Sequence, residues 1–225
     1  MPYSTPRRRQ LSVPPLLRRP TATLAFAAGI LLVWQFTLTT HDAESAVSDL
    51  LGVAPTPTLW AALATVVFGA TSLAWLIGVL GLSPAQAGLG VGRLGRHVAA
   101  YLGLCAIMLA ITLGTSFAPS FERVYPLAPT GGPLWFLTYG GALFATEVFF
   151  RGLLLFPFVP ALGRGAALVG VIPYVLVHAH KPPIEAAGAL AAGLVLSWLA
   201  LSSRSLWGGV ALHVVVAFTM EIAAV

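Results

Sequence analysis

Residues 134–158 read LWFLTYGGALFATEVFFRGLLLFPF, a run of 25 residues in which only Glu147 and Arg151 carry a charge. A transmembrane α-helix needs about 20 mainly apolar residues, so this run is long enough to cross a lipid bilayer. Backbone polar groups in lipid must be satisfied within the segment, which favours a helix. The fold of the chain therefore depends on how many further runs of this kind surround it.

The whole chain is poor in charge. Its 225 residues include 12 Lys+Arg and 7 Asp+Glu, 58% of them are hydrophobic, and the mean hydropathy is +0.90. Charged residues make up 8%, against roughly 25% in an ordinary soluble domain. Too few polar side chains remain to cover a water-facing surface, which argues against a soluble enzyme or a nucleic-acid-binding protein. The solvent of this chain is largely the lipid bilayer.

Apolar runs separated by charged or Pro/Gly-rich breaks predict an all-α fold, a polytopic transmembrane helical bundle of about seven passes. The short breaks between the last four runs indicate a compact bundle, and we expect one transmembrane domain over 21–225. The predicted passes lie at 21–39, 58–82, 98–118, 134–158, 165–180, 186–202 and 205–224.

The cations predict an N-in and C-out orientation, because short cytoplasmic loops are enriched in Lys and Arg. With the N-terminus inside, only Arg123 and Lys181 fall on the outer side, and the first outer loop is acidic through Asp42, Glu44 and Asp49. The cations that then face the cytoplasm are Arg7, Arg8, Arg9, Arg18, Arg19, Arg93, Arg96, Arg164 and Arg204.

Residues 1–20 are rich in Pro and Arg and predict a basic cytoplasmic tail. A cleaved signal peptide is the alternative interpretation. The apolar run from Thr21 to Thr40 is longer than a usual signal core and no small-x-small cleavage site follows it, so a retained anchor is favoured. Gly90-x-Gly92-x-x-Gly95 formally matches a dinucleotide fingerprint, but its neighbours are membrane spans and we interpret it as a cytoplasmic loop.

Ionisable side chains inside the predicted spans are the candidate functional residues, since each is costly in lipid unless it is paired or faces water. Glu147 and Arg151 are four positions apart and can pair on one helix face, either for function or only to make both charges tolerable. With a rise of about 1.5 Å per residue, Glu147 lies about 16 Å from the inner side, His178 about 20 Å and His213 about 12 Å. All three could therefore meet in one cavity near mid-membrane.

These groups predict an acid/base site. A carboxylate and an imidazole that share a water can deprotonate it, and a second imidazole can donate a hydrogen bond to a developing oxyanion. Such a site suits hydrolysis of a peptide bond inside the membrane. Zinc binding is the alternative role of the same groups. However, paired i,i+4 histidines are absent, and the charge of the adjacent Arg151 opposes binding of a divalent cation. We therefore expect no cofactor.

The loop after the fifth run carries further polar residues. His180, Lys181 and Glu185 flank the pair Pro182-Pro183, which stops the helix and predicts a tight turn. We interpret the three polar side chains as a solvated loop.

Three motifs follow one another in this part of the chain. They are Glu147-Val-Phe-Phe-Arg151-Gly152, then Tyr174-Val-Leu-Val-His178, and Leu212-His213 after the segment Gly193-Leu-Val-Leu-Ser-Trp-Leu-Ala. In this order they resemble the CPBP family, the CAAX prenyl endopeptidase and bacteriocin-processing group of intramembrane proteases. The resemblance covers about residues 134–220. It implies a glutamate-dependent protease in which glutamate and histidine activate water and a further histidine, with an asparagine, stabilises the oxyanion.

Two positions depart from the family pattern. The first motif usually begins with two glutamates, whereas this chain has Thr146-Glu147, and the asparagine expected four residues after His213 is Ala217. The single glutamate and the His-x-x-Lys-Pro pattern are similar to a bacterial branch associated with processing of C-terminal membrane anchors.

The leading hypothesis is a glutamic-type intramembrane endopeptidase in the bacterial inner membrane. In it Glu147 and His178 activate water, His213 stabilises the oxyanion and Arg151 positions Glu147. Its expected partner is a membrane-embedded or lipid-anchored protein substrate, with prenylated tails, bacteriocin leaders and C-terminal anchors all compatible. The alternative, motivated by Thr146 and Ala217, is a catalytically inactive membrane scaffold or interaction protein.

Overall fold

A computed structural model describes residues 15–35, 49–50, 52, 56–126 and 132–223. The part of the predicted basic tail that holds Arg7, Arg8 and Arg9 lies outside these residues, as do Asp42 and Glu44 of the predicted acidic loop. Within the described residues the chain is helical and contains no strand. The all-α fold class predicted from the sequence is confirmed.

Each of the seven predicted passes contains a helix. The long helices are α1 (Pro15–Val33), the continuous helix formed by α3 (Pro57–Ala64), η2 (Thr65–Ala70), α4 (Thr71–Leu73) and η3 (Ala74–Val79), α5 (Leu94–Thr115), α7 (Pro133–Glu147) with η4 (Val148–Leu153), α9 (Ala166–Val177), α10 (Pro183–Ser203) and α11 (Trp207–Ala223). Short helices connect them, namely α6 (Pro119–Glu122), η5 (Phe156–Phe158), α8 (Val159–Leu162) and η6 (Gly163–Gly165).

By length and apolar composition, several described segments could cross a membrane. They are Pro57–Val79, Leu94–Thr115, Pro133–Val177 and Pro183–Ser203, while the apolar helices Arg19–Val33 and Trp207–Ala223 are shorter. The fourth predicted pass ends earlier than expected, because the chain leaves the helix after Leu153 and turns through η5 and α8. The chain is an integral membrane protein, and its N-in and C-out orientation stays a prediction.

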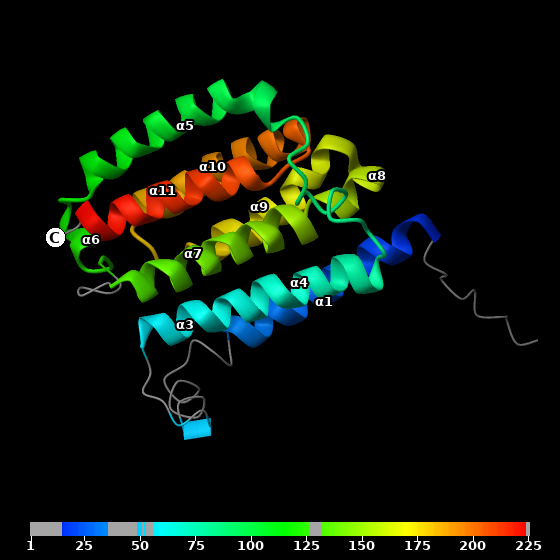
Figure 1. Ribbon diagram of the computed structural model, residues 1–225, viewed down its shortest axis with the longest axis horizontal. Coiled ribbons are helices and arrows are strands. Elements are labelled where there is room, and N and C mark those ends of the chain that lie inside the picture. The colour runs from blue at the N-terminus through cyan, green and yellow to red at the C-terminus, as the bar shows by residue number, and fades with distance from the viewer. Residues whose placement is uncertain (1–14, 36–48, 51, 53–55, 127–131, 224–225) are drawn as a thin grey trace, which may run out of the picture.

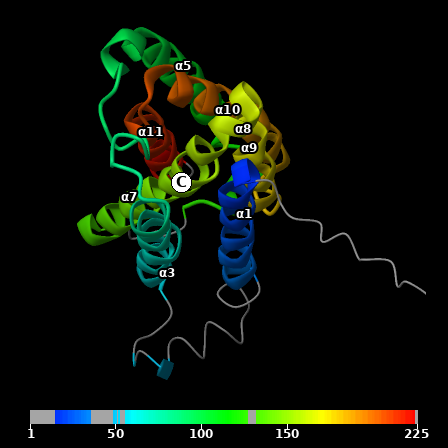
Figure 2. The same ribbon diagram turned by 90° about the vertical axis from the view of Figure 1, so that its right-hand side faces the viewer.

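Helix α7 lies in the middle of the bundle and has partners on two sides (Figure 1). It packs against α3 and η2 on one side and against α11 on the other, and α11 in turn packs against α5. Helices α9 and α10 form an antiparallel pair beside them, and Figure 2 shows α1 and α3 standing below the rest of the bundle. A residue near the end of α7 can therefore meet side chains from α9 and α11.

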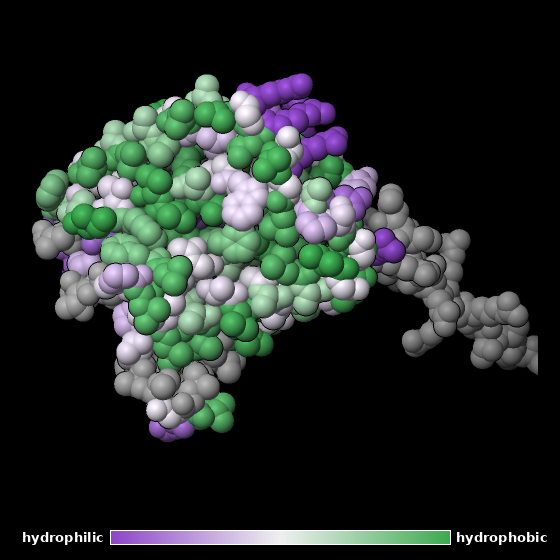
Figure 3. All heavy atoms as spheres, viewed as in Figure 1, coloured by the Kyte–Doolittle hydropathy of each residue, from purple (hydrophilic) through white to green (hydrophobic). Residues whose placement is uncertain are grey.

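Hydrophobic residues cover most of the face seen in Figure 3. Hydrophilic residues gather at the end of the molecule that holds α8 and the start of α5. Helix α5 exposes large apolar side chains, among them Leu102 at 65% and Ile107 at 59%. Exposing apolar side chains to water along a whole helix is unfavourable, so these side chains are suited to contact with lipid.

The turn between α9 and α10 is held by a hydrogen-bonded cluster. Tyr125 donates its hydroxyl hydrogen to Glu185 Oε1 over 2.9 Å and accepts a hydrogen bond from Lys181 Nζ over 3.1 Å. The Lys181 ammonium also lies 4.5 Å from the centre of the Tyr125 ring. Burial is the main cause that lowers the pKa of Lys181. The interpretation as a solvated loop is therefore wrong for Lys181 and Glu185, which are half-buried and hydrogen-bonded to Tyr125 from a distant segment, whereas His180 is exposed as that interpretation expects.

Tyr125→Phe is expected to lower the free energy of unfolding by about 1–3 kcal/mol, since both part-buried partners lose the hydroxyl that joins them. Thermal unfolding of the detergent-solubilised protein measures the change. Tyr101→Phe is the control, because the Tyr101 hydroxyl has a single long contact of 3.5 Å with Ser203 Oγ. Equal effects of the two substitutions would contradict a bridging role for Tyr125.

Candidate active site

Glu147 and Arg151 form a buried ion pair inside the bundle. Glu147 is the last residue of α7, and Arg151 follows in the π-helical segment η4, a kind of turn that is frequent at functional sites. Arg151 Nη1 donates a hydrogen bond to Glu147 Oε1 over 3.0 Å, and the side chains are 2% and 0% exposed. The pairing predicted from the i,i+4 spacing is confirmed. The ion pair makes both charges tolerable, because either charge would be strongly destabilising if it were buried alone.

His213 of α11 contacts the same carboxylate oxygen. Its Nδ1 lies 3.1 Å from Glu147 Oε1. An ionised carboxylate only accepts hydrogen bonds, so Nδ1 carries the hydrogen and a neutral ring keeps an acceptor lone pair on Nε2. The His213 side chain is 17% exposed, whereas that of Glu147 is fully buried. His213 is therefore the member of this pair that a water molecule can reach more readily.

Tyr174 of α9 connects the ion pair with the second histidine. The Arg151 guanidinium carbon lies 4.3 Å from the centre of the Tyr174 ring, a distance suited to a cation–π interaction. The rings of His178 and His213 lie 4.4 Å and 6.4 Å from the same ring. Tyr174 was part of a motif in the sequence but received no role there. Its position one helical turn before His178 is the signal that could have identified it.

His178 follows the last residue of α9 and is fixed by its own helix. Its Nδ1 lies 2.7 Å from the Tyr174 carbonyl oxygen. A carbonyl oxygen only accepts, so Nδ1 donates, and the neutral ring leaves Nε2 as an acceptor. Within the described part of the chain, His213 hydrogen-bonds Glu147 and His178 does not. The structure thus groups Glu147, Arg151 and His213 directly and brings His178 to them through Tyr174.

Gly209 allows α11 to approach the second oxygen of the carboxylate. A Cβ atom at position 209 would lie 2.8 Å from Glu147 Oε2. Oε2 has no hydrogen-bond partner among the described residues. Gly209 precedes His213 by one helical turn, so one face of α11 provides both the close approach and the imidazole.

Gly209→Ala is expected to push the carboxylate away from His213. A misplacement of about 1 Å at a catalytic group can reduce a rate by about 100-fold, and overpacking costs about 1–3 kcal/mol of stability. Gly188→Ala in α10 is the control, because nothing lies within 4 Å of a Cβ at that position. Turnover and thermal unfolding of both variants measure the effect, and a Gly209→Ala variant as active as wild type would contradict this packing.

The side chains of the site determine whether it could hold a metal ion. The described residues contain no group of three or more His, Cys, Asp or Glu that could hold a metal ion. Glu147 Oε1 already accepts hydrogen bonds from Arg151 and His213, which leaves two imidazole Nε2 atoms as the neutral nitrogens for another contact. Each of these Nε2 atoms can accept a hydrogen bond from a water molecule. The expectation that no cofactor is needed stays a prediction.

The segment that contains the site matches a known protein family. Residues 129–219 match the family model described as type II CAAX prenyl endopeptidase Rce1-like. The matched segment contains Glu147, Arg151, Tyr174, His178 and His213. No curated protein and no solved structure gives a significant match.

Proposed function

We propose that this chain is a glutamic-type intramembrane endopeptidase, because residues 129–219 match the family model described as type II CAAX prenyl endopeptidase Rce1-like. The observation that carries the proposal is the contact of one fully buried carboxylate oxygen, Glu147 Oε1, with both Arg151 and His213. A buried carboxylate that fixes an imidazole is the arrangement that turns histidine into a general base. The proposed substrate is a membrane-associated protein or peptide.

The proposed reaction begins with a water molecule held between His213 Nε2 and His178 Nε2. As the water oxygen attacks the carbonyl carbon of the scissile peptide bond, His213 Nε2 takes one of its protons. Glu147 stays ionised and stabilises the resulting imidazolium through the hydrogen on Nδ1. The tetrahedral intermediate then breaks its C–N bond, and His213 returns the proton to the leaving amine. The products are a carboxylic acid and an amine, and one water is consumed.

Arg151 and Tyr174 act in this proposal as positioning residues. The Arg151 guanidinium keeps Glu147 Oε1 in place and favours the ionised carboxylate. The face of the guanidinium is held in turn by the Tyr174 ring. This differs from the sequence-based hypothesis, in which His178 was the partner of Glu147, because the observed hydrogen bond to Glu147 comes from His213.

The test is cleavage by the purified protein in liposomes. A prenylated CAAX peptide and a peptide with an apolar C-terminal anchor are supplied as separate substrates, and mass spectrometry of the fragments identifies the cleaved bond. Cleavage of either peptide supports an endopeptidase and excludes a role as scaffold only. If neither peptide is cut by wild type but a Thr146→Glu/Ala217→Asn variant cuts them, the inactive alternative is correct.

Metal removal separates the proposed mechanism from a zinc-dependent one. Dialysis against a strong chelator is expected to leave the cleavage rate unchanged, because the proposed base is His213 paired with Glu147 and needs no Lewis acid. A rate that falls by more than about tenfold and returns with added zinc would overturn metal-free water activation, since zinc acts by lowering the pKa of its bound water to about 7. It would leave the endopeptidase assignment intact.

The proposed location is the bacterial inner membrane with the arginine-rich end toward the cytoplasm. The end that holds Arg93, Arg164 and Arg204 is the one that the cation bias assigns to the inside. Labelling of single cysteines introduced at each end, in intact cells and in lysates, checks this orientation.

A further inference from the structure

Carboxylates are missing from the end of the bundle opposite the Tyr125 cluster. Segments 83–97, 159–165 and 203–206 contain no Asp or Glu, yet they hold Arg93, Arg96, Arg164 and Arg204. Among the residues that the structure describes, neither Arg164 nor Arg204 forms an ion pair with a carboxylate. Counter-ions for these arginines must therefore come from outside the described part of the chain.

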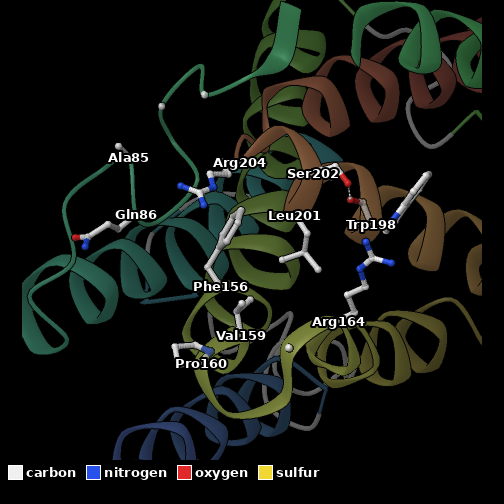
Figure 4. Close-up of a pocket in the computed structure, with 13 residues that line it drawn as sticks. Ala85, Gln86, Phe156, Val159, Pro160, Arg164, Trp198, Leu201, Ser202 and Arg204 are labelled. Carbon is white, nitrogen blue, oxygen red and sulfur yellow. Dashed lines mark hydrogen bonds between the residues drawn. The ribbon is translucent and has the colours of Figure 1, made fainter. Parts of the chain in front are cut away.

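A cavity of about 740 Å³ lies at this end, between α8, the end of α10 and the loop before α5. Arg164 and Arg204 line it on opposite sides of Phe156 and Leu201 (Figure 4). Trp198 also lines it and is 54% exposed. Trp is enriched where a membrane meets water, and the combination of guanidinium groups with an apolar floor suits an amphipathic anion.

The rim of the cavity is fixed by close backbone contacts. The Arg93 N–H donates to the Ser203 carbonyl over 2.6 Å. Gly92 has a positive φ of 48°, and a Cβ there would lie 2.3 Å from the same carbonyl oxygen, so glycine is required for this approach. Arg204 itself adopts the left-handed conformation at the end of α10. The position of its backbone is thus set by the fold, while its side chain stays exposed.

A second cavity of about 390 Å³ extends the same region toward α1. It shares Gln86, Phe156 and Pro160 with the first and is lined in addition by Arg19. Neither cavity is lined by Glu147, His178 or His213, so both are separate from the candidate active site.

We propose that this arginine-lined cavity binds an anionic phospholipid of the surrounding leaflet, with its acidic headgroup attracted by the guanidinium groups of Arg164 and Arg204 on the two sides of the cavity and its acyl chains along Leu201 and Trp198. A cavity of this size exceeds what inorganic phosphate fills, and its floor is apolar. Arg binds phosphate through paired N–H donors, and basic pockets between transmembrane helices on the cytoplasmic side are suited to acidic headgroups. The site does not depend on the proposed proteolysis.

Native mass spectrometry of the full chain from nanodiscs tests the proposal. The discs contain equal amounts of phosphatidylglycerol and phosphatidylcholine, and the lipid retained by the protein is counted. Wild type is expected to retain phosphatidylglycerol preferentially. Each of Arg164→Gln and Arg204→Gln is expected to lower that preference by about 5-fold, the effect of about 1 kcal/mol per cation near a membrane surface.

Arg96→Gln is the control, because Arg96 is exposed at the same end but does not line either cavity. Its lipid preference is expected to equal that of wild type. Equal retention of the two lipids by wild type, or the same loss in Arg96→Gln as in Arg164→Gln, would overturn the site. Displacement of the retained lipid by millimolar glycerol phosphate would instead assign the cavity to a soluble phosphate compound and overturn its assignment to a lipid.

Discussion

Glu147→Gln is expected to lower the cleavage rate by about 10⁴-fold, the effect of neutralising the carboxylate that supports a catalytic histidine. Gln keeps the shape of Glu147 but cannot stabilise an imidazolium on His213. The same substitution leaves Arg151 buried without its counter-ion, which costs about 3–5 kcal/mol of stability. Loss of activity in this variant alone would therefore be ambiguous between chemistry and folding.

The double variant Glu147→Met/Arg151→Met resolves the ambiguity. Replacing both members of a buried ion pair with hydrophobic residues of similar volume is often neutral or stabilising. We expect the double variant to unfold near the wild-type temperature and still to lack activity. Thermal unfolding and peptide cleavage are measured on the same preparation. A stable double variant that cleaves at the wild-type rate would remove Glu147 from the mechanism.

His213→Gln is expected to reduce the rate by about 10²–10⁴-fold, the usual contribution of a general base. Its effect on stability is expected to be small, because the side chain is partly exposed and Glu147 retains its contact with Arg151. His178→Gln is expected to have a weaker effect on the rate, since His178 only helps to hold the water in the proposed reaction. The measurement is kcat on one peptide substrate for both variants.

The ranking of the two histidine variants decides between two mechanisms. A greater loss in His178→Gln than in His213→Gln would favour the roles expected from the sequence, with His178 as base. His97→Gln provides the control, because His97 lies on α5 and its Nδ1 contacts the Arg93 carbonyl of its own helix start. The rate of this variant is expected to match that of wild type.

Much of the fold follows from composition and run length. Apolar runs of about 20 residues must form helices in lipid, whatever their neighbours are. The same reasoning located Glu147 and Arg151, because ionisable residues inside such runs are rare and their i,i+4 spacing puts them on one helix face. Estimated depths also indicated that Glu147, His178 and His213 could approach one another.

The sequence by itself thus determined a helical membrane bundle, the buried ion pair and the set of candidate residues. Only the tertiary structure decided that His213 binds Glu147, that Tyr174 contacts both Arg151 and His178, and that Tyr125 covers Lys181. The physical reason is rotation about the helix axis. A helix that is apolar on all sides carries no pattern that tells which face meets which neighbour, so contacts between distant helices are set by packing of the whole bundle.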